Sequence, residues 1–116
     1  MTKNKYIEND CNIAIAAMSG EDNWVSGYCR LCCYIYIFQA KINNTSSSLG
    51  INGGRVSKLS VWCVEEAGER IRNREAAHYY ERDWKVKSEI GNDPVACSAI
   101  ISWLEQLPPV SSDKAS

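Results

Sequence analysis

The stretch DPVACSAIISWLEQL, residues 93–107, decides the fold class of this chain. Asp93 is a residue type that caps helix N-termini, and Pro94 suits the first helical position. Pro108 and Pro109 cannot continue a helix and therefore end it. Apolar side chains recur at spacings of three and four, at Ala96, Ala99, Ile100, Trp103 and Leu107. Because one apolar stripe needs one surface to cover it, we predict that this helix packs on a sheet and is anchored by Trp103.

The residues before the helix predict the strands of that sheet. Residues 24–42 are rich in β-branched and aromatic side chains, and they exceed a typical strand about three-fold. A bend or hairpin at Gly27, or near Arg30, should therefore divide them. Residues 43–54 contain several turn-forming types and predict a loop. Residues 55–65 alternate in polarity and predict the next strand.

The strand at residues 55–65 should have two different faces. One face carries Leu59, Val61 and Cys63, and the other carries Val56, Lys58, Ser60, Trp62 and Val64. Residues 77–86 predict a further strand with a bulge near Arg82 and Asp83, a device that protects sheet edges from pairing with other chains.

Two segments are open to alternative interpretations. Residues 11–18 fit a short helix that begins at Asp10 and ends at Gly20, and they also fit a strand; we favour the helix. Residues 66–76 are densely charged and form either an extended hairpin tip or a short exposed helix.

Together these elements predict an α+β fold, an antiparallel β-meander of three to five strands with the C-terminal helix packed on one face. A chain of 116 residues has room for a single domain, which we place at residues 11–108. Residues 1–10 form a polar lead-in, and residues 109–116 form a mobile tail.

Composition narrows the classes of function. Hydrophobic residues make up 45% and charged residues 23% of the chain, a globular balance. The net charge of −1 disfavours nucleic-acid or anionic-membrane binding through bulk charge. No apolar run is long enough to span a membrane. The polar start lacks the features of a secretory signal, so we expect a cytoplasmic protein whose six cysteines are free thiols.

Two motifs resemble those of a known group of proteins. The segment GINGGRVSKL, residues 50–59, is followed by YERDWKV, residues 80–86, and by the terminal helix. This pattern resembles a family of small uncharacterised bacterial and phage proteins, in which Gly usually stands at the position of Asp83. The chain also looks like proteins carried on mobile integron gene cassettes. The resemblance covers residues 24–107 and implies a shared fold, but no activity.

The glycine-rich segment is a candidate ligand site. Glycines allow main-chain N–H groups to converge on an anion, and two cations follow them. The candidate residues are Asn52, Gly53, Gly54, Arg55 and Lys58. The same residues are typical of a structural turn before a strand, which is the alternative interpretation.

Cysteine and histidine suggest no complete reactive site. Cys29 and Cys32 have the spacing of a zinc or redox pair, but the chain has no second such pair, so we expect no metal and no cofactor. His78 is the only histidine and could act with Cys63, which is the basis of an enzyme alternative. We assign no catalytic residue.

Aromatic residues exceed what one small core requires, and Trp62, Tyr79 and Trp84 are candidate interface residues. We therefore expect a non-enzymatic binding module that acts as a homodimer or higher oligomer, with a small molecule as a further conceivable partner. The alternatives are a small enzyme that uses His78, and single-stranded nucleic-acid binding through an aromatic sheet face, which the net charge disfavours.

Overall fold

The computed structural model describes residues 13–19, 23–66, 69–71 and 75–107, which form one antiparallel sheet and one α-helix. The strands are β1 (Ile13–Ser19), β2 (Trp24–Leu31), β3 (Tyr34–Ile42), β4 (Val56–Glu66), β5 (Glu69–Arg70), β6 (His78–Glu81) and β7 (Asp83–Lys87). They follow the order β1-β2-β3-β4-β6-β7, and β5 pairs with the end of β4. The predicted antiparallel meander is confirmed, with seven strands instead of three to five. The predicted lead-in and tail, residues 1–10 and 109–116, lie outside the described residues.

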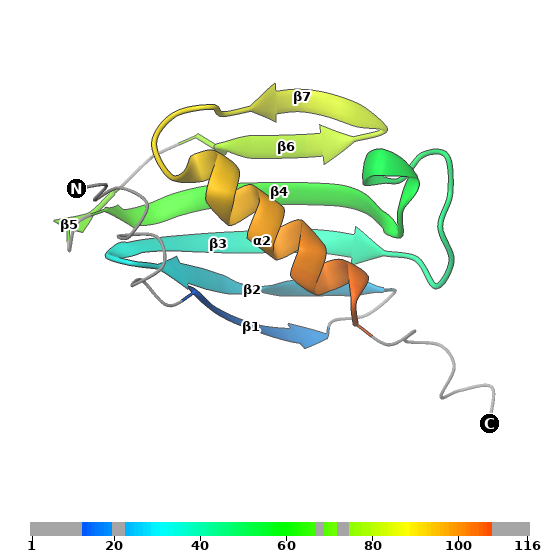
Figure 1. Cartoon of the computed structure of the whole chain (residues 1–116), viewed down its shortest axis with the longest axis horizontal. Coiled ribbons are helices and arrows are strands. Elements are labelled where there is room, and N and C mark those ends of the chain that lie inside the picture. Colours follow the sequence, from blue (N-terminus) through cyan, green and yellow to red (C-terminus); the bar gives the residue numbers. More distant parts are fainter. Residues whose placement is uncertain (1–12, 20–22, 67–68, 72–74, 108–116) are drawn as a thin grey trace, which may run out of the picture.

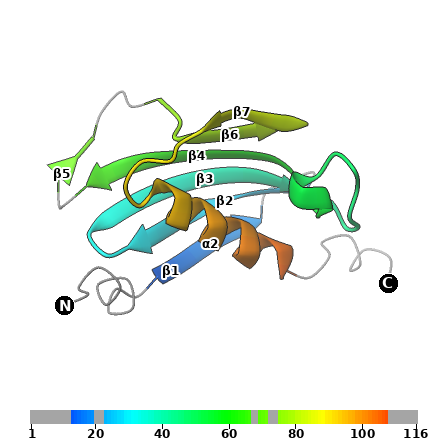
Figure 2. The ribbon, with the colours of Figure 1, turned by 45° about the horizontal axis from the view of Figure 1, so that its top comes forward.

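The helix α2 (Asp93–Glu105) crosses one face of the sheet diagonally (Figure 1). It contacts β2, β3 and β4, and no described element covers the opposite face (Figure 2). This arrangement confirms the prediction of a C-terminal helix packed on one side. No helix in the described part of the chain is both long enough and apolar enough to cross a membrane.

The helix buries a stripe that differs from the predicted one. Its buried residues are Ala96, Cys97, Ile100 and Leu104. The prediction that Trp103 is the anchor is wrong, because Trp103 is only half-buried and meets Phe38 edge-on, with the ring centroids 6.5 Å apart. The stripe is turned toward Cys97 and Leu104, and away from Trp103 and Leu107.

Helix α2 begins one residue earlier than predicted. Asn92 is the N-cap, and Asp93 is the first helical residue. The Asp93 carboxylate does not cap the helix, because it accepts hydrogen bonds from the hydroxyls of Tyr36 at 2.8 Å and Ser88 at 2.6 Å. The proline pair predicted to end the helix lies outside the described residues.

The preference for a helix at residues 11–18 is wrong, and the strand alternative is correct. Every residue of β1 pairs with β2, from Ile13 opposite Leu31 to Ser19 opposite Val25. Helix propensity is a weak preference, and pairing along a whole strand overrides it. The helix signals at Asp10 and Gly20 lie outside the described residues.

Residues 24–42 are divided as predicted, at the alternative near Arg30. The chain reverses at Cys32 and Cys33, where Cys32 has a φ of 58°. Gly27 does not bend the chain: it lies inside β2, where an added Cβ would collide with the main-chain oxygen of Ala16. Glycine at this position allows β1 to approach β2.

The charged segment at residues 66–76 continues a hairpin where it is described. Glu65 pairs with Arg70, and Glu66 pairs with Glu69. This pairing agrees with the extended-hairpin alternative and not with the exposed helix.

The strand predicted at residues 77–86 is in fact two strands. The chain reverses at Arg82, which has a φ of 74° and connects β6 to β7. The expected bulge near Arg82 is therefore a complete turn. A register shift between Tyr79 and Tyr80 places Trp84 opposite Tyr80.

A second register shift changes the faces predicted for β4. Lys41 pairs with Lys58, but Ile42 pairs with Val56, so one residue is added to β4 at this point. Val56 consequently turns toward α2 and is fully buried, together with Leu59, Val61 and Cys63. The prediction that Val56 shares a face with Lys58 is wrong.

The buried stripe of α2 gives a test of the helix anchor. We expect Leu104→Ala to lower the free energy of unfolding by about 2–5 kcal/mol, because Leu104 is fully buried and its truncation leaves a cavity. The same substitution at the half-buried Leu107 should cost clearly less. Urea denaturation of both variants measures the difference. Equal losses would contradict this packing.

Candidate functional site

The glycine-rich segment is held against the C-terminal end of α2. It contains the short 3-10 helix η1 (Ile51–Gly53), in which Asn52 and Gly53 are exposed and have φ values of 54° and 73°. An added Cβ at Gly54 would collide with the Glu105 carboxylate. Glycine at this position therefore lets an acidic side chain approach the main chain.

Glu105 supplies an anion to this segment from within the chain. Its carboxylate accepts hydrogen bonds from the main-chain N–H of Arg55, at 2.8 and 3.1 Å, and from that of Val56, at 3.2 Å. The Arg55 guanidinium donates to the carbonyl oxygens of Asn43, Glu105 and Leu107, at 2.9, 3.0 and 2.6 Å. The N–H groups that the motif presents thus fix the helix to the start of β4.

These contacts give Gly54 and Arg55 a structural role, whereas Asn52 and Gly53 form the exposed turn before them. Binding of a further ligand by Asn52, Gly53, Gly54 and Arg55 stays a prediction. Lys58, the fifth candidate, lies apart from this junction.

The face of the sheet opposite α2, here called the open face, carries an apolar row. Tyr28 on β2 pairs with Ile37 on β3, and Ile37 pairs with Trp62 on β4. Tyr28 is 47% exposed and Ile37 is 43% exposed, whereas Trp62 is half-buried. Tyr79 lies on the same face, opposite Ser60. Two of the three predicted interface residues therefore share this surface.

Trp84, the third predicted interface residue, lies on the side of α2. Its ring meets the rings of Tyr80 and His78 edge-on, with centroids 5.1 and 6.2 Å apart, and it packs against the core. The register shift in the β6–β7 hairpin places Trp84 beside Tyr80, which is buried. Simple alternation along one long strand could not predict this placement.

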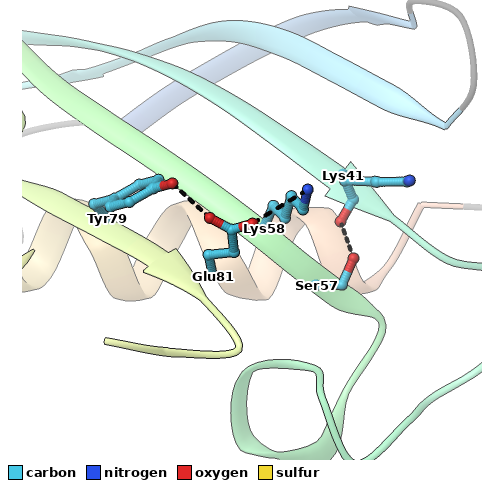
Figure 3. Close-up of polar contacts among 5 residues, drawn as sticks. All are labelled: Lys41, Ser57, Lys58, Tyr79 and Glu81. Carbon is cyan, nitrogen blue, oxygen red and sulfur yellow. Dashed lines mark hydrogen bonds and ion pairs between the residues drawn. The ribbon is translucent and has the colours of Figure 1, made fainter. Parts of the chain in front are cut away.

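Polar side chains gather at one end of the open face (Figure 3). Lys58 pairs across the strands with Lys41 on one side and Glu81 on the other. The Lys58 ammonium lies 3.5 Å from the Glu81 carboxylate, which also accepts a hydrogen bond from the Tyr79 hydroxyl at 2.7 Å. The hydrogen bond from Tyr79, followed by the charge of Lys58, lowers the pKa of Glu81. Lys58 also lies over the ring of Trp24 at 6.0 Å.

His78 is fully buried and has no free nitrogen. The main-chain N–H of Ser88 donates to Nδ1 at 3.3 Å, so Nδ1 is unprotonated, and Nε2 donates to the carbonyl of Asp93 at 3.0 Å. Burial lowers the pKa of His78, although the Asp93 carbonyl opposes this effect. Because both nitrogens bind main-chain groups and not a thiol, the geometry gives no support to catalysis by a Cys–His pair.

The cysteines behave mainly as apolar residues. Cys29, Cys33, Cys63 and Cys97 form no disulfide, as expected, but Cys32 is disulfide-bonded, so the expectation of six free thiols is wrong. Burial raises the pKa of Cys29 and of Cys97 to about 11, which keeps both protonated at neutral pH. Among the described residues, no group of three or more His, Cys, Asp or Glu side chains could hold a metal ion.

Sequence reasoning missed the acids at the two ends of α2. Asp93 is predicted only as a helix cap, and no role is predicted for Glu105. A negative charge near a helix C-terminus interacts unfavourably with the helix dipole. The position of Glu105 could therefore have indicated that its carboxylate binds a hydrogen-bond donor outside the helix. The partner of Asp93, Tyr36, is 57 residues away in the sequence, and nothing local indicates it.

The Glu105 junction can be tested by removing its carboxylate. Glu105→Ala should lower the free energy of unfolding by about 1–3 kcal/mol, because it leaves main-chain donors of Arg55 and Val56 unpaired. The neighbouring Gln106→Ala, at an exposed position, should change it by no more than about 0.5 kcal/mol. Chemical denaturation of the two variants compares them, and equal stabilities would contradict the junction.

His78 predicts a pH-dependent stability. Its folded-state pKa is lowered below 6.5, so the unfolded chain takes up a proton that the folded chain does not as the pH falls below 6.5. The free energy of unfolding should therefore be independent of this group above pH 6.5 and decrease below it. Protonation of Glu81, whose pKa in the folded chain is lowered from its ordinary value of 4.5, affects the free energy of unfolding only at pH values below 4.5.

The measurement is the free energy of unfolding between pH 6.5 and 4.5, for the natural chain and for His78→Gln. The variant should be less stable at neutral pH, but its stability should decrease less over this interval. An unchanged slope in His78→Gln would assign the pH dependence to other groups.

Comparison with known proteins gives a family and no activity. No curated protein and no solved structure matched the chain. One family model, described as "Domain of unknown function (DUF7678)", matches residues 23–105. These residues run from the start of β2 to the end of α2 and include the glycine-rich segment and its Glu105 partner. The chain therefore belongs to this family, the domain of unknown function DUF7678.

Proposed function

We propose that the protein is a small non-enzymatic binding module that forms a homodimer through the open face of its sheet. The row of Tyr28, Ile37 and Trp62 carries this proposal. When one face of an antiparallel sheet packs on a helix, the other face is normally polar. Here, large apolar side chains on that other face form neighbouring pairs across three strands.

The apolar row borders a groove that adds to this surface. A hollow of about 460 Å³ is lined by Ala16, Ala17, Gly27, Tyr28 and Ile37, together with one serine. The side chains that line the groove are mostly small and apolar. Strand β1 contributes its alanines, and β2 contributes Gly27 and the ring of Tyr28. Contiguous exposed apolar surface of this kind is typical of interaction sites.

The charges around the row favour a second copy of the chain as the partner. Arg30, Ile35 and Glu65 form a cross-strand row at one end of the open face, and Lys58 and Glu81 lie at the other end. A two-fold axis perpendicular to β4 and parallel to the sheet would set Glu65 of one copy over Lys58 of the other. The two apolar rows would then lie between these charge pairs, which is the self-complementarity that a two-fold interface requires.

Two further parts of the proposal concern the origin and location of the protein. Four of the described cysteines form no disulfide, which supports a cytoplasmic location because reducing compartments prevent disulfide formation; the disulfide at Cys32 argues against it. An origin on a mobile integron gene cassette is supported only by the resemblance of the motifs.

The oligomeric state tests the proposed function. At high micromolar concentration, sedimentation equilibrium should give a mass of twice the 13.0 kDa chain. Ile37→Lys should give a monomer, because it places an unpaired charge in the centre of the contact. Ile90→Lys is the matched control, since Ile90 is 77% exposed and lies before α2, away from the open face. A monomeric natural chain, or equal effects of the two variants, would overturn the proposal.

A further inference from the structure

We infer that a small pocket at the polar end of the open face binds a phosphate group. The pocket has a volume of about 240 Å³ and lies between the loop after β3 and the turn between β6 and β7. Its charged lining residues are Lys41, Lys58, Arg82 and Glu81, three cations against one acid. Pockets for drug-sized ligands measure roughly 300–1,000 Å³, so this volume suits a small ion better than a cofactor.

The two lysines form a like-charged pair. Lys41 and Lys58 are directly opposite on neighbouring strands; the Lys58 ammonium lies toward Glu81, and the Lys41 side chain extends away from it (Figure 3). Like charges in this position destabilise a sheet, and the Glu81 carboxylate offsets only the charge of Lys58. The pair therefore points to a negatively charged ligand.

The acid in the pocket is already engaged. Each oxygen of the Glu81 carboxylate has a partner: Tyr79 donates to one, and the Lys58 ammonium contacts the other. Within the described residues, neither Lys41 nor Arg82 forms an ion pair. Two of the three cations thus have no ion-pair partner among the residues that the structure describes, and together they match the charge of a dianion.

Arg82 adds an independent argument. It occupies the tip of the β6–β7 turn with a φ of 74°, a left-handed conformation that glycine adopts without strain and that arginine does not. Arginine at this point provides a planar set of N–H donors that suits phosphate geometry. Asn43 also lines the pocket and offers a neutral amide donor beside these charges.

The phosphate site is inferred independently of the proposed dimer, in which Glu65 of the second copy would compete with phosphate for Lys58. Inorganic phosphate is the probe, because it carries the inferred chemistry without any other binding group. A phosphate group can also reach the pocket on a larger small molecule. Glycerol phosphate tests that source. If glycerol phosphate binds more tightly than inorganic phosphate, the natural ligand is a phosphate monoester; if the two bind equally, it is the free ion.

The experiment is isothermal titration calorimetry with sodium phosphate, at an ionic strength held constant with sodium chloride. The natural chain should bind phosphate, and Lys41→Gln should bind it at least ten-fold more weakly. Lys87→Gln is the matched control: it removes one positive charge at an exposed position outside the pocket, and its affinity should stay unchanged.

Arg82→Gly separates binding from folding. Glycine suits the positive φ, so the variant should unfold at the same or a higher temperature and still bind phosphate at least ten-fold more weakly. Full binding by Arg82→Gly, equal losses in Lys41→Gln and Lys87→Gln, or no binding by the natural chain would overturn the inference. Binding of a single-stranded oligonucleotide without binding of inorganic phosphate would overturn it too, in favour of a nucleic-acid surface.

Discussion

Two carboxylates hold α2 in place, and the rest of the structure depends on this attachment. At the N-terminal end, Asp93 accepts hydrogen bonds from Tyr36 on β3 and from Ser88 in the connection that precedes the helix. At the C-terminal end, Glu105 accepts hydrogen bonds from the main chain at the start of β4. Both contacts join charged acceptors to partly buried donors, and such hydrogen bonds are stronger than neutral ones. They fix the direction in which the helix crosses the sheet.

The fixed helix gives the two faces of the sheet different chemistry. On its side, buried side chains form a continuous core, and the only histidine is held neutral there between main-chain groups. On the open face, an apolar row lies beside a polar end that carries Lys41 and Lys58. The proposed dimer contact and the inferred phosphate pocket are neighbours on this face because the helix leaves all of it uncovered.

The glycine-rich segment shows how far a motif can be interpreted. Its glycines and Arg55 suggest main-chain N–H groups that meet an anion, but the N–H groups that do so are those of Arg55 and Val56, directly after the glycines. The anion is Glu105, which lies 50 residues further along the chain. A local pattern of glycines and cations is the same whether the partner is a ligand or the chain's own side chain, so the sequence could not separate the two cases.

The sequence by itself determined the α+β class, the antiparallel sheet and the terminal helix, because alternation and helical spacing are local properties. At residues 13–19 these local signals were ambiguous, and only pairing with β2 decided for a strand. The sequence also indicated the surplus of aromatic residues. Only the tertiary structure decided which face each residue occupies, because a register shift of one residue turns a side chain to the other side of a sheet. Such shifts bury Val56 and bring Trp84 beside Tyr80, whereas Trp62 and Tyr79 stay on the open face. A register shift is a property of how two strands pair, so the sequence of one strand alone does not predict it.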